Sequence, residues 1–493
     1  MKFSVGRGFR RDSLNRERNP IMEELSSTAD IAKATEAKIS RRSVLKGGTA
    51  VAVGAAASAL ANPTVANAAS FNPKKFAGSK VKVLLVDGER DQNGLLSKKK
   101  YIKDTYGIDV EVTALSLGAQ IEKMNSSLNA STSEYDIIDV LGFFVSGVVG
   151  AGKFTQLDSY IKDSSMTPAS YNYPKDFPKG QLDYTSKYDI AGKKFGGSNT
   201  YLIPGIHSGS VIMFYREDLL KQAGLSVPKN WDDYLTVAQK LNTKGVYGTS
   251  MIGGNDVSLI LVDWFARFAS MGGKLMSGTP AAGTYKPNLT SSASIKALQN
   301  MVDCAKFSPK GVGSFGFTES VDAFSRGDVG IMLCWSTIGG SIFNKDNSMV
   351  SALTNVAEVP GAPGRPIRGG WGLGIPKNLS KKRKDAAWMV MQYITSADFD
   401  KYQFDKHQTD PNRLSTYNDK ALNAKWPYLK VAGKAMENGN ILDVAVIPEC
   451  FELVGEAARE FNLAILGTQS VQTACSNAQS SWEKILRRAG HLK

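Results

Sequence analysis

Two tryptophans within residues 323–377 are the strongest candidates for binding chemistry in this chain. Trp335 follows the apolar run 329–333, and Trp371 lies within Arg-Gly-Gly-Trp-Gly-Leu-Gly-Ile-Pro. The first run does not alternate polar and apolar residues, so it predicts a strand buried on both faces. An indole at the carboxyl end of such a strand can stack on a flat apolar ligand face. The alternative for each indole is core packing. Two tryptophans at two predicted strand ends favour ligand binding.

Glycines and carboxylates supply candidate hydrogen-bonding groups for the same site. Gly370 and its glycine neighbours leave little side-chain bulk beside Trp371, so backbone donors can approach a ligand closely. Asp87 and Glu89 follow the apolar run 81–86, which predicts a first buried strand. In open α/β sheets, ligands bind at the carboxyl edge of the strands. We therefore expect Asp87, Glu89 and Gly370 to bind ligand hydroxyls.

Catalytic and nucleotide-binding motifs are weak or missing. The sequence has no G-x-S-x-G, no H-E-x-x-H, and no His and Cys at metal-ligand spacing. Residues 147–153 fit G-x-x-x-x-G-K, but Phe154 stands where a phosphate loop needs a hydroxyl, so we predict no nucleotide site. A glycosidase needs only two carboxylates, which leaves a secreted carbohydrate-active enzyme as the alternative class. We expect a binding protein without catalytic residues, cofactor or metal.

Length and charge define the class of protein further. A chain of 493 residues is too long for one ordinary core and predicts two or three units. No apolar run reaches the length of a membrane-spanning helix. The net charge of +14 comes from scattered basic residues, with dense clusters only at 98–100 and 381–384. Because no aromatic residues interleave with these clusters on one face, we expect no nucleic-acid partner.

The amino end has the features of an export signal. Ser-Arg-Arg-Ser-Val-Leu-Lys at 40–46 precedes a small-residue apolar run at 47–61, and Ala-Asn-Ala at 66–68 offers a cleavage site. We predict that residues 1–68 form a cleaved twin-arginine signal, which implies the translocase as a partner and a periplasmic protein. Met22 is an alternative start. That route exports folded proteins from a reducing cytosol, so the fold should not depend on disulfides between Cys304, Cys334, Cys450 and Cys475.

The first half of the mature chain alternates strands with helices. This order predicts a parallel, doubly wound α/β sheet whose strand ends carry ligand loops. Phe143 and Phe144 follow the third strand and so become candidate ligand contacts, the alternative being a hydrophobic staple for the next helix. Further along, Asn230 is predicted to cap a helix. The predicted strands are 81–86, 108–115 and 135–141, and the predicted helices are 94–106, 120–131, 290–307, 382–395 and 471–489.

Several of these segments together resemble one known family. Phe324-x-x-Gly327 leading to Trp335, then Gly369-Gly-Trp-Gly-Leu-Gly-Ile-Pro-Lys377, resembles the signature region of extracellular solute-binding proteins of the sugar-binding family 1. These are the maltose-binding-protein-like receptors of ABC importers. The likeness extends over about residues 80–485. It implies a type II periplasmic binding protein, with two doubly wound α/β lobes joined by a multi-strand hinge. It also implies a monomer that passes a sugar, oligosaccharide or sugar alcohol to permease subunits.

The resemblance also implies a course of the chain between the lobes. Residues 69–207 would form the first part of lobe 1, and residues 208–335 the first part of lobe 2. Residues 336–410 would return through the hinge, and 411–493 would add helices mostly to lobe 2. Hinge closure around the ligand is the implied mechanism.

Three further candidates for ligand contact come from the resemblance. His207 stands where many relatives place an acidic or amide group, Trp264 lies in a region that lines the second lobe, and Arg413 belongs to a Pro-x-Arg loop. The alternatives are a loop histidine, a core tryptophan and a surface ion pair. The same fold binding a polyamine, an anion or iron also stays open, although the tryptophan pair favours carbohydrate.

Overall fold

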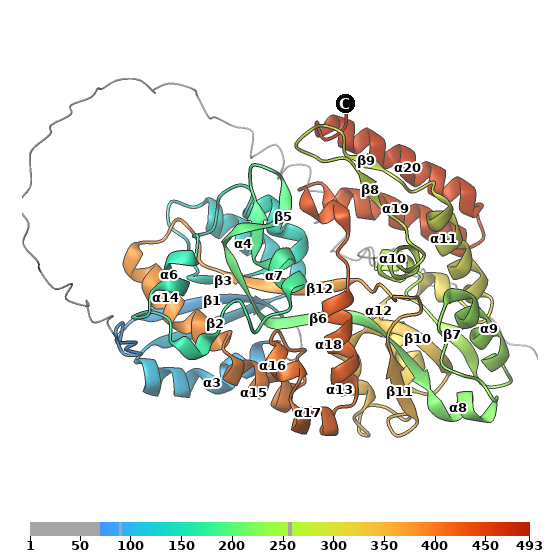
Figure 1. Ribbon diagram of the computed structural model, residues 1–493, viewed down its shortest axis with the longest axis horizontal. Helices are drawn as coiled ribbons and strands as arrows, with labels where there is room; N and C mark the ends of the chain where they lie inside the picture. The colour runs from blue at the N-terminus through green and yellow to red at the C-terminus, as the bar shows by residue number, and fades with distance from the viewer. Residues whose placement is uncertain (1–69, 88–90, 255–258) are drawn as a thin grey trace, which may run out of the picture. The chain divides into compact units, whose positions relative to one another are not determined.

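The computed structural model describes residues 70–87, 91–254 and 259–493, and one eight-stranded sheet organises this part of the chain (Figure 1). Three of its strands lie between residues 80 and 141: β2 (Asp109–Leu115), β1 (Lys80–Val86) and β3 (Ile137–Leu141). β1 pairs in parallel with both of the others. α3 (Asp91–Tyr106) and α4 (Leu117–Asn129) connect these strands in the predicted order. The predicted parallel, doubly wound arrangement is confirmed.

One long strand belongs to both parts of the sheet. β6 (Leu202–Arg216) pairs antiparallel with β12 (Arg368–Gly374) through its first nine residues. Its remaining residues pair with β10 (Val329–Trp335) and β11 (Thr354–Ala357), and β10 pairs in turn with β7 (Tyr247–Ser250). In Figure 1, β6 and β12 run from the first group of strands toward the second. The predicted lobe boundary at residue 207 falls inside β6, and the other predicted boundaries stay a prediction.

Both parts of the sheet are buried on two faces. Along β1, Val83 and Leu85 belong to one apolar cluster, whereas Leu84 faces another. Along β10, Leu333 faces one cluster and Cys334 the opposite one. Because side chains alternate along a strand, continuous apolar runs are what two-sided burial requires. The strand predicted at 329–333 is therefore confirmed.

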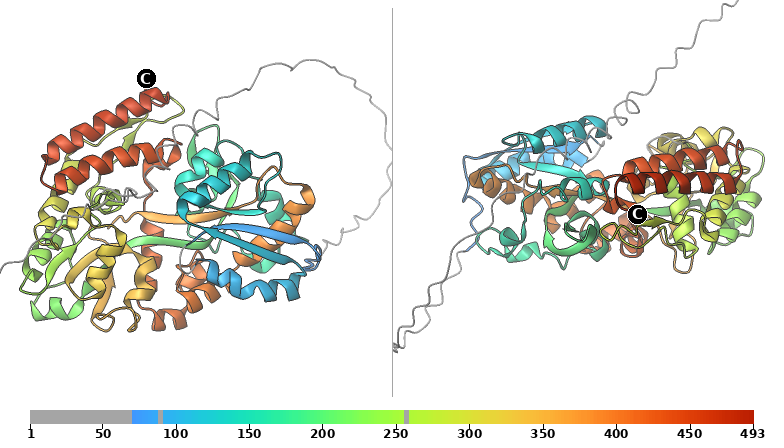
Figure 2. Two further views of the ribbon diagram at one scale, coloured as in Figure 1. Left: turned by 180° about the vertical axis from the view of Figure 1, so that it is seen from behind. Right: turned by 90° about the horizontal axis from the view of Figure 1, so that it is seen from above.

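Helices cover the sheet. Asn230 caps α9 (Trp231–Leu241) as predicted, accepting a hydrogen bond from the Asp233 N–H at 2.8 Å. α19 (Cys450–Ile465) and α20 (Val471–Arg488) lie side by side (Figure 2). No helix in the described residues is long and apolar enough to cross a membrane. The other main helices are α7 (Lys179–Thr185), α8 (Glu217–Gln222), α10 (Ile260–Ser270), α11 (Ser292–Ala305), α12 (Phe317–Ser325), α14 (Lys381–Ile394), α15 (Ala397–His407), α16 (Leu414–Tyr417), α17 (Lys420–Lys425) and α18 (Tyr428–Asn438).

The four cysteines are buried as free thiols. Burial raises the pKa of the Cys304 and Cys475 thiols to about 11, so they stay protonated at neutral pH. Cys334 lies in β10 as a small apolar residue, as predicted. The twin-arginine segment lies outside the described residues.

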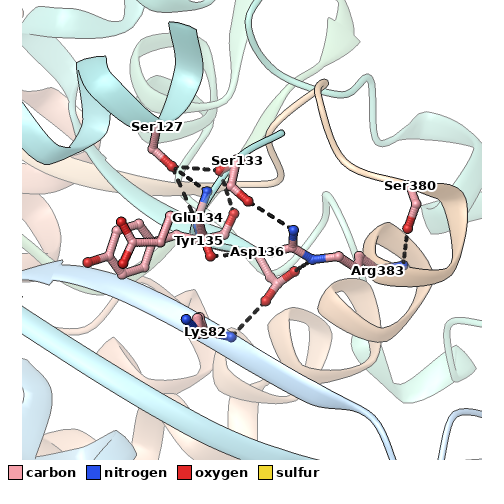
Figure 3. Close-up of polar contacts among 8 residues, drawn as sticks. All are labelled: Lys82, Ser127, Ser133, Glu134, Tyr135, Asp136, Ser380 and Arg383. Atoms are coloured by element: carbon pink, nitrogen blue, oxygen red, sulfur yellow. Dashed lines mark hydrogen bonds and ion pairs between the residues drawn. The ribbon is translucent and has the colours of Figure 1, made fainter. Parts of the chain in front are cut away.

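Hydrogen bonds around Asp136, which we call the polar clamp, fix the amino edge of the strands β1, β2 and β3 (Figure 3). We call these three strands the first strand group. The buried Asp136 carboxylate, just before β3, accepts hydrogen bonds from the Lys82 N–H at 2.8 Å and from Arg383 Nε at 2.7 Å. Arg383, on α14, also donates to the Ser133 carbonyl at 2.9 Å. Ser127 of α4 accepts hydrogen bonds from the backbone N–H groups of residues 134 and 135. Thus β1, α4 and α14 hold the turn that begins β3.

Candidate functional site

The two candidate tryptophans come from β10 and β12, the two strands on either side of β6, and lie at the carboxyl edge of the first strand group. Trp335 is the last residue of β10, as predicted, and is half-buried. Trp371 lies in the middle of β12, so the prediction of a strand end is wrong for this residue. It pairs with Leu141, the last residue of β3, because β12 runs antiparallel to β3. Antiparallel pairing thus brings a mid-strand tryptophan to the edge where ligand loops are expected.

Glycines make room for the Trp335 ring. A Cβ placed on Gly369 would lie 3.0 Å from Cζ3 and 3.1 Å from Cη2 of Trp335. Gly369 pairs across the sheet with Gly209 of β6, so neither strand has a side chain at this point. The indole therefore lies over bare backbone. Part of the ring packs against the core, and the rest stays available to a ligand.

A bulge in β6 positions His207 beside Trp371. The register with β12 shifts between the pairs Gly370–Ser208 and Gly372–Pro204, so residues 205–207 lie opposite Trp371. Ile206 in this bulge has φ of 67°, a left-handed conformation that is unfavourable for a β-branched residue. The His207 ring lies 6.3 Å from the Trp371 ring, centroid to centroid. Strained backbone of this kind is often kept where it aims a functional side chain.

Phe143 and Phe144 form an aromatic contact with the C-terminal helices. They end a short 3-10 turn after β3, and the Phe144 ring stacks on Phe451 with centroids 4.7 Å apart. Phe143 meets the same ring at 5.7 Å and Tyr184 at 6.4 Å. Phe451 lies in the first turn of α19. Sequence reasoning missed Phe451, although residues 411–493 were expected to add helices to the lobes.

Two predicted ligand residues belong to the fold instead. The Trp264 side chain is fully buried, stacks on Phe268 at 4.6 Å and donates its Nε1–H to the Ser294 carbonyl at 3.3 Å. Arg413 is also fully buried. Its guanidinium donates to the Thr395 carbonyl at 2.9 Å and to the Tyr171 carbonyl at 2.8 Å. We therefore exclude Trp264 and Arg413 from the candidate site.

The remaining predicted residues lie at the strand ends. Asp87 is exposed at the end of β1, where its backbone N–H donates to the Leu115 carbonyl at 2.6 Å. Gly370 lies in β12 between the glycine beneath Trp335 and Trp371 itself. Glu89 lies outside the described residues. Within the described chain, no group of three or more His, Cys, Asp or Glu side chains is placed to hold a metal ion.

A buried carboxylate that the sequence did not predict supports this edge. The Cβ direction of Gly209 leads toward Asp410 Oδ2 at 3.5 Å and Ser336 Oγ at 3.7 Å. The Ser336 hydroxyl donates to the Asp410 carboxylate and accepts a hydrogen bond from the Ser210 N–H at 3.2 Å. Relatives were expected to carry an acidic or amide group at the position of His207, on β6 itself. Here the carboxylate comes from a loop about two hundred residues further along the chain.

A groove of about 510 Å³ lies apart from these residues. It is bordered by residues 192–194, where β4 (Lys187–Asp189) turns into β5 (Lys194–Thr200), by the later turns of α10, and by residues 440–446. None of the predicted ligand residues lines it. We therefore take as the candidate site the aromatic residues Phe143, Phe144, Trp335 and Trp371, at the carboxyl end of β3 and on the adjoining parts of β12, β6 and β10. We call this site the aromatic edge.

This architecture defines a class of protein: a solute receptor in which one long strand joins two α/β parts beside an aromatic edge. Residues 93–401 match the family model described as bacterial extracellular solute-binding protein. The chain therefore belongs to that family, and the predicted family resemblance is confirmed. The family consists of binding proteins.

Two curated proteins are similar over most of the chain. A probable amino-acid ABC transporter periplasmic-binding protein, y4oP of Sinorhizobium fredii, is 26% identical, with 88% of this chain and 96% of that protein covered. A mannitol-binding protein of Pseudomonas aeruginosa is 24% identical, with 76% of this chain and 85% of that protein covered.

Solved structures share the fold. A solute-binding protein of an ABC transporter from Agrobacterium radiobacter K84, in complex with ribitol, has a TM-score of 0.69 at 23% identity. The alignment covers 83% of this chain and 99% of that one. The maltose-bound MalE3 of T. maritima also has a TM-score of 0.69, at 20% identity, with 83% and 100% covered. The predicted type II periplasmic-binding-protein fold is confirmed.

Proposed function

We propose that this solute-binding protein captures a small polyol or monosaccharide in the periplasm and delivers it to the permease subunits of an ABC importer. The observation that carries the proposal is the half-buried Trp335 ring over the bare backbone of Gly369 and Gly209. An indole face there can stack on the C–H face of a polyhydroxylated ligand. Backbone groups freed of side chains can bind its hydroxyls.

The second indole favours a compact ligand. Trp371 is only 7% exposed, so a ligand can reach only the edge of its ring, whereas it can stack on the face of the Trp335 ring. The stacked rings of Phe144 and Phe451 cover the end of β3 on one side. A long oligosaccharide would need more open aromatic surface than this edge presents. The similar mannitol-binding protein, and the similar solute-binding protein solved in complex with ribitol, support a small polyol.

Hinge closure is the mechanism that this topology supports. β6 pairs with β12 in one part of the sheet and with β10 in the other, so rotation about β6 and β12 changes the distance between the two parts. A ligand that contacts both Trp335 and the end of β3 binds better when the parts are closed. It therefore shifts the population toward the closed state, which the permease would recognise. Export by the predicted twin-arginine signal belongs to the same proposal.

The ligand class is tested by titration of the mature protein. We expect mannitol, ribitol or a related polyol to quench or enhance tryptophan fluorescence and to raise the midpoint of thermal unfolding, since a ligand at a hundredfold excess over Kd stabilises by about 2.7 kcal/mol. The panel should include maltose and neutral amino acids, because y4oP is named for amino acids. Trp335→Ala should weaken polyol binding by about 1–3 kcal/mol.

Two outcomes would contradict the proposal. Binding of amino acids but of no polyol or sugar would change the ligand class. Unchanged polyol affinity in the Trp335→Ala, Trp371→Ala double variant would reject the aromatic edge as the site. Turnover of a glycan by the purified protein would instead support the alternative of a secreted carbohydrate-active enzyme.

A further inference from the structure

β12 carries polar groups on the face opposite Trp335. Side chains alternate along a strand, so neighbouring residues face opposite sides of the sheet. The Cβ direction of Gly369 leads to Trp335, whereas that of Gly370 leads to Gln181 Nε2. A Cβ on Gly180 would nearly coincide with Nη1 of Arg368. Arg368 of β12 and Gln181 of α7 thus lie together behind the aromatic edge.

Both side chains are buried, and four of their polar atoms have no hydrogen-bond partner among the described residues. Gln181 is 0% exposed and Arg368 is 8% exposed. Both polar atoms of the Gln181 amide, and Nε and Nη1 of Arg368, hydrogen-bond to no described residue. The carboxylate of Asp183, on the same helix as Gln181, forms its ion pair with Lys179. The guanidinium therefore has no counter-charge in contact with it among the described residues.

A buried cation in this condition requires a partner. Charged side chains are rarely buried unless they are paired, because desolvation is costly and water no longer satisfies their hydrogen bonds. Burial lowers the pKa of Arg368 to about 10, which leaves the group protonated at neutral pH. The unpaired Arg368 nitrogens and Gln181 Nε2 are all hydrogen-bond donors. A cluster of N–H donors around one positive charge matches an anion.

We propose that the Arg368–Gln181 cluster holds a small monovalent anion, chloride in the natural environment. The two side chains have almost no exposed area, so the occupant must be small. Gly180 and Gly370 have no side chains, so the Arg368 guanidinium and the Gln181 amide pack directly against their backbones. This site is separate from the proposed polyol site, which lies across the sheet. The anion would neutralise a charge inside the strand pair that joins the two parts of the molecule.

Bromide locates the site directly. Crystals of the mature protein soaked in sodium bromide should show an anomalous peak within hydrogen-bonding distance of Arg368 Nε or Nη1 and Gln181 Nε2. Density at that position without an anomalous signal would be a water molecule and would overturn the proposal. A peak only at exposed lysines would show an adventitious ion and would also overturn it.

A second test uses thermal unfolding without any sugar, so its outcome does not depend on the polyol proposal. Chloride replaces gluconate at constant ionic strength. We expect the unfolding midpoint of the wild-type protein to rise and saturate with chloride. Arg368→Met should lose this increment, whereas Arg365→Met, which removes an exposed charge from the same approach to β12, should keep it. An equal response to chloride in Arg368→Met, or no response in the wild type, would refute the site. If Arg368→Met does not fold, Gln181→Leu replaces it, with a weakened increment expected.

Discussion

The two ends of β3 differ in how the chain satisfies its polar groups. At the amino end, the carboxylate of Asp136 has a backbone donor and an arginine donor, and every element around the turn is tied to another (Figure 3). At the carboxyl end, Leu141 meets Trp371 among aromatic rings, glycines and a strained bulge, and the Asp410–Ser336 hydrogen bond supports this edge. The polar groups at the amino end of β3 are hydrogen-bonded without a ligand, whereas the carboxyl end presents apolar surface and bare backbone to a ligand.

This difference separates stability from binding. When all of its hydrogen bonds are formed, the polar clamp fixes the register of the strands and makes this end rigid. Removing one partner would leave another buried polar group without a hydrogen bond. An edge of rings and glycines contributes less to holding the strands but can adapt to a ligand. Substitutions at the amino end should therefore reduce the free energy of unfolding and leave affinity intact in the folded fraction. Substitutions at the carboxyl end should do the reverse.

The largest effect is expected from breaking the clamp. Asp136→Ala removes a buried carboxylate and leaves the Arg383 guanidinium without its charged partner. The free energy of unfolding should fall by about 3 kcal/mol. Urea denaturation measures this loss, and titration of the folded protein should show unchanged polyol affinity. A large loss of affinity with little loss of stability would reverse the assignment of the two ends.

A pH effect of slightly smaller size tests the support beneath the carboxyl end. Asp400 accepts hydrogen bonds from the N–H groups of Asn412 and Arg413, in the loop that carries Asp410. Burial raises the pKa of the Asp400 carboxyl to about 6. The folded state then holds the proton more tightly than the unfolded state, whose pKa is about 3.9. The contribution of Asp400 to stability is thus greatest below about pH 4 and is lost as the pH rises to about 6.

The expected loss across this window is about 2–3 kcal/mol. It is measured as the difference between wild-type and Asp400→Asn stability curves from pH 4 to pH 7, because other carboxyl groups titrate in both proteins. Parallel curves for the two proteins would show that Asp400 ionises normally in the folded state.

Trp371 sharpens the comparison at the carboxyl end. The ring is mostly buried beside His207, so Trp371→Leu should lower polyol affinity by about 1 kcal/mol, less than truncation of Trp335. Calorimetric titration of both variants ranks the two indoles. A larger loss for Trp371→Leu than for Trp335→Ala would make the buried ring the principal platform.

The smallest effect is expected from an exposed ion pair near the amino end. Lys103 and Asp109 are paired, but their side chains are 49% and 58% exposed. Lys103→Ala should change the free energy of unfolding by less than about 0.5 kcal/mol. This variant is the control for Asp136→Ala, because it removes one partner of an ion pair that water can replace. A loss as large as that of Asp136→Ala would mean that burial does not explain the clamp.

Regular elements were predictable where a local rule determines them. The apolar runs at β1 and β10 marked strands buried on two faces, and Asn230 marked a helix start. The motif around Trp335 and Trp371 identified the family, because a short run of glycines and aromatic residues at fixed spacing is rare.

The candidate site was predictable only in part. Trp335 and Phe143 were proposed as ligand contacts because each lies at or just after a strand end, and strand ends are visible in the pattern of residues. Trp264 and Arg413 carry the residue types of a ligand site, but their burial depends on neighbours far away in the sequence. Phe451 and Asp410 have no local feature that distinguishes them from other aromatic and acidic residues.

The amino-acid sequence by itself determined the strands, the helices, the family and the presence of an aromatic edge, since these depend on neighbouring residues and on short motifs. The tertiary structure decided which side chains share that edge. Antiparallel pairing places Trp371, a mid-strand residue of β12, beside the end of β3. Trp335 packs against one face of β12, and the Arg368 side chain lies on the other face. Such placements follow from register and packing between distant segments, which no local pattern of residues specifies.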